Sequence, residues 1–139
     1  MKALIKQVEG LSLVGKSDSN HWVPLDSIKT FGGAEAGNKP MEMVLIALGG
    51  CSAMDVLSIL KKMREDVRDF DIELEAERAS DHPAVFTKIH LKYVVTGKDL
   101  KEENINKAID LSMNKYCSVT AMLKESVDIT WDFSLQEVD

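Results

Sequence analysis

Two cysteines are the residues most suited to chemistry, Cys51 in IALGGCSAMDVL and Cys117 in YCSV. A thiol reacts mainly after it ionises, because the thiolate is both the nucleophile and the metal ligand. Cys117 stands before a short helix predicted over residues 118–124, whose N-terminal dipole would stabilise a thiolate. Two cysteines are too few for a secreted disulfide scaffold, so each is either a buried core thiol or a redox group.

The histidines and Asp55 have simple structural interpretations. His21, His82 and His90 share no ligand spacing with either thiol, so the sequence predicts no metal site. Asp55, one helical turn after Cys51, is expected to be a buried polar group bonded to backbone. If it is charged and close, it opposes ionisation of that thiol.

A long helix predicted from Pro40 to about residue 64 carries Cys51. From Met43 to Leu60 its only polar side chains are Ser52, Asp55 and Ser58. At a rise of 1.5 Å per residue it extends roughly 37 Å, longer than a domain of this size is wide. We therefore expect a second copy of the chain to cover part of it. Gly49 and Gly50 would permit a tight helix contact at a two-fold interface.

The remaining elements follow from turn residues and hydrophobic periodicity. Strands are expected over 3–8, 11–16 and 22–26, before a flexible loop, TFGGAEAGNKP. After the long helix, DIELEAERA and VFTKIHLKYVV alternate as a hairpin, and Asp99 and Glu102 have capping-box spacing at the start of a second helix. A short helix and a strand over 127–135 close the chain. This order predicts an α+β fold with mainly antiparallel sheets, in a single domain of residues 1–139.

Charge and composition narrow the possible partners. The net charge is −6 and no basic stripe occurs, which disfavours nucleic acid and anionic membranes. Asp55 and the glycine pair argue against a transmembrane helix. The first residues, MKALIKQVEG, lack the apolar stretch of a signal peptide, so we expect a cytoplasmic protein.

Two segments together resemble a known family. NKPMEMVLIALGGCSAMDVLSIL, followed further along by LSMNKYCSVTAML, is similar to the two signature segments of the OsmC/Ohr family, the osmotically inducible and organic hydroperoxide resistance proteins. The order of strands and helices agrees over essentially the whole chain. The resemblance implies an intertwined α+β homodimer with long central helices between mainly antiparallel sheets.

The resemblance also implies a thiol peroxidase that reduces organic hydroperoxides in oxidative stress defence. Cys51 then corresponds to the peroxidatic cysteine and Cys117 to the resolving one. A sulfenic acid formed on the first thiol is captured by the second as a disulfide, which a dithiol reductant, in this family typically a dihydrolipoyl group, opens again. No cofactor is needed. The apolar helix would line a cleft that favours bulky organic peroxides.

The sequence departs from the peroxidase pattern at two places. Met41 replaces the first glutamate of the family's Pro-Glu-Glu sequence, which leaves Glu42, a first-turn carboxylate favoured by the helix dipole. The N-terminal arginine that stabilises the thiolate is absent, and Lys29 is the best replacement, with Lys16 and His21 behind it. The alternative function is therefore a non-enzymatic OsmC-like dimer that binds a small hydrophobic ligand or a partner.

Overall fold

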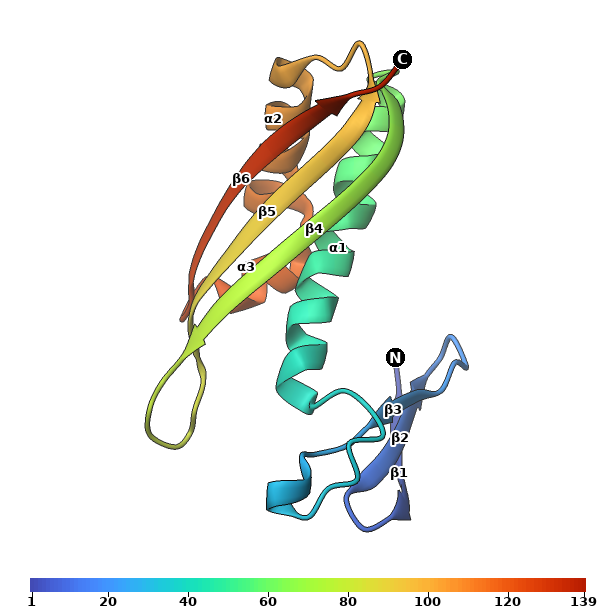
Figure 1. Ribbon diagram of the computed structural model, residues 1–139, viewed down its shortest axis with the longest axis vertical. Coiled ribbons are helices and arrows are strands. Elements are labelled where there is room, and N and C mark those ends of the chain that lie inside the picture. Colours follow the sequence, from blue (N-terminus) through green and yellow to red (C-terminus); the bar gives the residue numbers. More distant parts are fainter. The chain divides into compact units, whose positions relative to one another are not determined.

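The computed structural model describes residues 1–139, whose contacts group into two compact units, residues 1–46 and residues 47–139. The prediction of a single domain stays a prediction. The N-terminal unit holds a three-stranded antiparallel sheet in the order β1 (Ala3–Glu9), β2 (Ser12–Ser17) and β3 (Val23–Leu25), drawn in blue in Figure 1. These strands match the three that the sequence predicts to within two residues at each end.

Asp26 organises the loop that follows β3. The loop contains one short 3-10 helix, η1 (Lys29–Phe31). The Asp26 carboxylate accepts hydrogen bonds from Ser12 Oγ at 2.6 Å and from the backbone N–H groups of Ser27, Ala34 and Ala36 at 2.7, 3.2 and 3.1 Å. The Ser12 hydroxyl first, and then the Ser27 amide, lower the pKa of Asp26 to about 2. One buried carboxylate thus ties this loop to the sheet.

The long helix α1 spans Pro40–Lys62 and passes from the first unit into the second. At its start, Glu42 Oε2 accepts a hydrogen bond from the backbone N–H of Lys39 at 2.8 Å. This is the reciprocal contact of a capping box, and it confirms the interpretation of Glu42 as a first-turn carboxylate. After the helix Arg64 adopts a left-handed φ of 62° and turns the chain into the next strand.

The C-terminal unit contains a second three-stranded sheet, in the order β4 (Asp66–Arg78), β5 (Phe86–Lys98) and β6 (Asp128–Glu137). β4 and β5 form the predicted antiparallel hairpin, whereas β6 pairs with β5 in parallel. Parallel neighbours need a crossover connection. Three of the four strand pairs are antiparallel, so the predicted mainly antiparallel pairing is correct.

Helices form that crossover connection. α2 spans Glu102–Leu111, a π-helical turn η2 spans Ser112–Tyr116, and α3 spans Ser118–Leu123. The capping-box prediction is wrong, because the N-cap of α2 is Lys101 and no side chain caps it. Asp99 instead has a left-handed φ of 51°, and its N–H donates to Glu137 Oε1 at 2.7 Å.

The core of the C-terminal unit lies between the sheet and the helices, which stand behind it in Figure 1. From Ile89 to Val95, β5 contributes every second side chain, as its alternation predicts. At the start of the strand the alternation breaks, because Phe86 is buried and Thr87 is exposed. Hydrophobic side chains that are at most 1% exposed come from α1, β5 and α2, namely Leu48, Val56, Leu60, Ile89, Leu91, Tyr93, Val95, Ile105, Ala108 and Ile109.

The two glycines of α1 have different surroundings. Gly49 is buried, and a Cβ added there would lie 2.9 Å from Leu74 Cδ1 of β4. The close approach at Gly49 is therefore to a strand of the same chain, which corrects the prediction of a helix contact at that position. Gly50 is exposed, and a Cβ there would meet nothing within 4 Å. Only Gly50 remains available for the predicted contact between helices.

Exposed apolar residues form a stripe along α1. Its members recur at intervals of three or four residues, Ile46, Gly50, Met54 and Leu57, and we call them the α1 stripe. The Met54 side chain is 76% exposed. α1 is long and apolar enough to cross a membrane, but core helices of soluble proteins can be equally long and apolar. The prediction of no membrane partner stays a prediction.

Candidate active site

Both thiols and one carboxylate meet at a single point of the C-terminal unit. Cys51 and Asp55 lie one turn apart on α1, and Cys117 is the N-cap residue of α3. The two Sγ atoms and a carboxylate oxygen of Asp55 all lie within 4.8 Å of one another. Both cysteines are free. A disulfide bond is about 2.05 Å long, so the sulfur atoms need to approach by at most about 3 Å to form one.

The thiols differ in their access to solvent. Cys51 is partly exposed, whereas Cys117 is 3% exposed and its Sγ accepts a hydrogen bond from the backbone N–H of Thr120 at 3.4 Å. This contact belongs to the N-terminal turn of α3, where the sequence places Cys117. Cys51 is therefore the thiol that a molecule from solution reaches first.

A chain of buried hydroxyl groups adjoins the cysteines. Ser52 Oγ lies 2.6 Å from Tyr93 Oη and 2.9 Å from Ser112 Oγ, and Ser112 Oγ donates to Asp55 Oδ2 at 3.1 Å. The Tyr93 hydroxyl also donates to Met113 Sδ at 3.3 Å. Asp55 is thus bonded to a side-chain hydroxyl and not to backbone, which corrects the sequence-based interpretation.

Burial disfavours the ionised forms of two acidic side chains in this region, Tyr93 and Cys117. It raises the pKa of Tyr93 to about 12, against the lowering effect of its hydrogen bond with Ser52. Burial likewise raises the pKa of Cys117, which the neighbouring Cys51 thiol raises further and the contacts with Thr120 lower. Within the C-terminal unit no ion pair involves Asp55. Cys51, Asp55 and Cys117 therefore lie together without a basic side chain paired to any of them in this unit.

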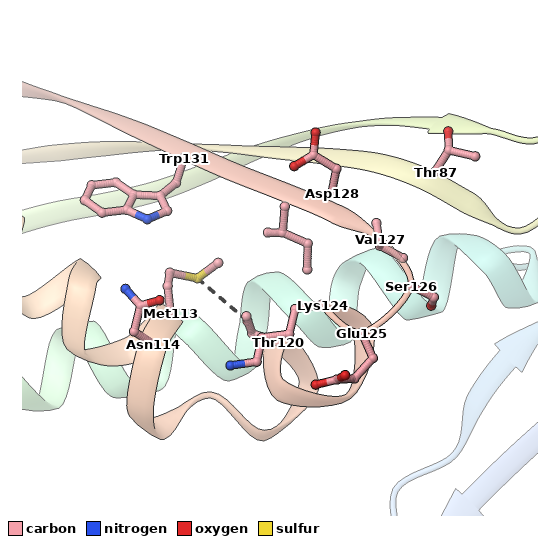
Figure 2. Close-up of a pocket in the computed structure, with 11 residues that line it drawn as sticks. Thr87, Met113, Asn114, Thr120, Lys124, Glu125, Ser126, Val127, Asp128 and Trp131 are labelled. Atoms are coloured by element: carbon pink, nitrogen blue, oxygen red, sulfur yellow. Dashed lines mark hydrogen bonds between the residues drawn. The ribbon is translucent and has the colours of Figure 1, made fainter.

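A pocket of about 600 Å³ is lined by residues of η2, α3 and β6 (Figure 2). Met113 and Thr120 line this pocket and share the contact dashed in the figure. Thr120 also donates its N–H to Cys117 Sγ, and Met113 Sδ accepts from Tyr93. Trp131 and Asp128 of β6 line its opposite side. No residue of α1 lines this pocket, so it is not the apolar cleft that the sequence predicts along that helix.

The supporting residues predicted from the sequence lie in the N-terminal unit. Lys29 is exposed in η1, Lys16 lies on β2, and His21 precedes β3. Glu42 is engaged with Lys39, whose Nζ lies 3.6 Å from its carboxylate. The roles of Lys29 and Glu42 at Cys51 stay predictions.

The family model described as OsmC-like protein matches residues 32–132, which include both cysteines and Asp55. The chain belongs to the OsmC-like family. The sequence-based assignment to OsmC/Ohr proteins is thereby confirmed. Among curated OsmC-like relatives, Protein YhfA of Escherichia coli strain K12 is 46% identical over 135 residues, which cover 97% of this chain and 98% of YhfA.

Solved structures confirm the OsmC-like fold. A hypothetical protein from Aquifex aeolicus VF5 has a TM-score of 0.82 at 32% identity, with 97% of this chain and 96% of that chain covered. The organic hydroperoxide resistance protein OsmC of Legionella pneumophila has a TM-score of 0.68 at 12% identity, with 96% and 97% covered. At 12% identity the second likeness shows the fold alone.

Sequence reasoning missed most of the polar partners in this OsmC-like site. Ser52 carried a signal, because it recurs at four-residue intervals with Leu48 and Val56 on the buried face of α1. A polar side chain on such a face requires a hydrogen-bond partner. Ser112 carried the same signal, because it follows Ile105, Ala108 and Ile109 on the buried face at helical spacing. Tyr93 gave a weaker one, because it fits the apolar alternation of β5.

Proposed function

We propose that this protein is a cytoplasmic thiol-dependent peroxidase that reduces organic hydroperoxides. The proposal rests chiefly on one observation, the proximity of the two thiols in an OsmC-like fold. Cys51 Sγ and Cys117 Sγ come from segments far apart in the sequence and lie within 4.8 Å. Proteins of the same fold are named for organic hydroperoxide resistance, including OhrB of Bacillus subtilis, with a TM-score of 0.64.

The exposure of the thiols supports a division of roles. In the first step the partly exposed Cys51 thiolate attacks one oxygen of the peroxide, the O–O bond breaks, and the alcohol leaves as Cys51 becomes a sulfenic acid. In the second step the Cys117 thiol displaces water from that sulfenic acid and forms the disulfide. A dithiol reductant, such as a dihydrolipoyl protein, then takes the two oxidising equivalents.

Treatment with cumene hydroperoxide tests this chemistry directly. One equivalent added to the reduced protein should yield an intramolecular disulfide between Cys51 and Cys117, detected by mass spectrometry of unreduced peptides. Cys51→Ser should abolish turnover with a dithiol. Cys117→Ser should allow the first oxidation and then drive Cys51 on to sulfinic acid under repeated peroxide. Reactivity no faster than that of free cysteine, without a disulfide, would overturn the proposal.

Lys29 is the proposed substitute for the arginine of the family's peroxidases. A cationic side chain near a thiolate stabilises it and thereby raises the rate of peroxide attack. Lys29→Met should slow the oxidation of Cys51, most strongly near neutral pH, as followed by stopped-flow mixing with cumene hydroperoxide. Lys107→Met, which removes an exposed cation of α2, is the matched control and should leave the rate unchanged. Equal rates for both variants would contradict the role of Lys29.

A non-enzymatic dimer is the competing function, and Asp55 is the observation that favours it. A carboxylate within 4.8 Å of both sulfur atoms opposes the formation of a thiolate. In that case the protein binds a small hydrophobic ligand or a partner, and both thiols stay reduced after cumene hydroperoxide. The disulfide measurement therefore separates the two functions.

A further inference from the structure

The cluster formed by Cys51, Asp55 and Cys117 has the composition of a metal site. Two sulfur atoms and one carboxylate oxygen, all within 4.8 Å of one another, come from one turn of α1 and from the N-cap of α3. Tetrahedral zinc with Zn–S bonds of about 2.3 Å separates two sulfur ligands by about 3.8 Å. Small side-chain rotations therefore bring the donors into coordination distance.

Electrostatics in the C-terminal unit favours a cation at this point. Each of the three groups is anionic when ionised, and like charges this close disfavour one another. No ion pair within the unit offsets the charge of Asp55. A divalent cation would supply the missing positive charge and would stabilise both thiolates.

Hydrogen bonds hold two of the three candidate metal-ligand atoms in place. Ser112 Oγ donates to Asp55 Oδ2 at 3.1 Å, and the Thr120 N–H donates to Cys117 Sγ at 3.4 Å. Hydrogen-bonded partners of this kind orient metal ligands in proteins. Two sulfurs and one oxygen suit a borderline-soft ion such as Zn²⁺ better than Mg²⁺ or Ca²⁺.

We propose that the reduced protein binds one zinc-class divalent cation through Cys51 Sγ, Cys117 Sγ and a carboxylate oxygen of Asp55. Binding replaces two thiol protons by the cation and releases both protons to solvent. Three protein ligands leave one of four tetrahedral positions for water or another small ligand. The proposed site contains no histidine. The lack of a ligand spacing between the histidines and the cysteines therefore does not bear on it. It goes beyond the proposed peroxidase function, because a disulfide would consume both sulfur ligands and exclude the metal.

Cobalt titration tests the site without any peroxide. Co²⁺ added anaerobically to the reduced, EDTA-treated protein should produce thiolate-to-cobalt charge-transfer absorption that saturates at one Co²⁺ per chain. Zn²⁺ should displace the cobalt and bleach the bands. Cys51→Ser and Cys117→Ser should each weaken the charge-transfer absorption and lower the affinity. Asp55→Asn keeps the acceptor oxygen for Ser112, so it should fold and bind Co²⁺ at least ten-fold more weakly, as checked by circular dichroism and titration.

The matched control is Asp110→Asn, which changes an exposed carboxylate of α2 that bonds only Asn114 among the side chains. It should bind Co²⁺ like the unmodified protein. Absence of charge-transfer bands, or equal Co²⁺ affinity in the Asp55 and Asp110 variants, would overturn the site. These readouts are independent of the peroxidase proposal, since a protein that forms no disulfide with cumene hydroperoxide can still show the cobalt spectrum, and the reverse.

Discussion

Ser52 is the residue on which the buried hydroxyl chain depends. It is fully buried, and its hydroxyl contacts both Tyr93 and Ser112. Without it, the Tyr93 hydroxyl would retain only the weak acceptor Met113 Sδ. A buried polar group that loses its partner costs about 1–3 kcal/mol of stability, more than the net value of the hydrogen bond itself.

Ser52→Ala should therefore lower the free energy of unfolding by about 1–3 kcal/mol in urea titrations. Tyr93→Phe should cost about 1 kcal/mol, because Ser52 still bonds Ser112. The double variant should lose less than the sum of the two single variants, since the unpaired hydroxyl is then gone. Ser58→Ala, at an exposed position of the same helix, is the control and should change stability by no more than about 0.5 kcal/mol. Strict additivity would contradict this account.

At the scale of single elements, the loop after β3 depends on the charge of Asp26. Its pKa of about 2 in the folded protein lies below the ordinary value of 3.8. A lowered folded-state pKa means that this stabilisation is complete above the ordinary value and is lost as the pH falls towards the lowered one. The loop should thus tolerate pH 5 and loosen between about pH 4 and pH 2.

Asp26→Asn tests the charge while keeping the size of the side chain. The amide accepts fewer hydrogen bonds than a carboxylate, so the loop should be cleaved several-fold faster by a protease with sites in residues 27–39 at neutral pH. The unmodified protein should gain the same susceptibility only in acid, where pepsin is the practical probe. Asp18→Asn, at an exposed turn, should behave like the unmodified protein. A protected loop in Asp26→Asn would show that the charge is not needed.

Periodicity predicted the elements well, because each strand and helix shows its buried face within a few residues of sequence. The long helix α1 and the hairpin of β4 and β5 follow from such local patterns. The parallel pairing of β6 did not, since alternation specifies a strand but not its neighbour. The proximity of Cys51 to Cys117 likewise depends on how α1 and α3 pack, which no local pattern encodes. The Asp99 prediction failed because a left-handed residue displaced the start of α2.

At the scale of the whole molecule, the α1 stripe exposes apolar side chains to water, which is energetically unfavourable. A contiguous exposed apolar surface usually marks an interaction site. Gly50 in the middle of the stripe has open space beside it, which allows another backbone to approach closely. We propose that a second copy of the chain covers the stripe, in a two-fold homodimer.

Light scattering at micromolar concentration should give twice the chain mass of 15.4 kDa. Gly50→Leu should raise the dissociation constant of the dimer by roughly ten- to a hundred-fold, because overpacking of a close contact costs about 1–3 kcal/mol. Lys62→Leu adds a side chain of the same kind near the end of α1, away from the stripe, and should leave the mass unchanged. A stable 15.4 kDa particle for the unmodified protein would refute the dimer.

The parallel pairing of β6 has a consequence for biosynthesis. β5 lies between β4 and β6, and β6 is the last strand of the sheet to be synthesised. Until residues 128–137 emerge, one edge of β5, the most buried strand of the folded sheet, stays unpaired and able to join a strand of another nascent chain. The crossover through α2 and α3 must also form before β6 can dock, which slows this step because the pairing is non-local. Newly made chains should therefore depend on chaperones most during the synthesis of the segment between β5 and β6.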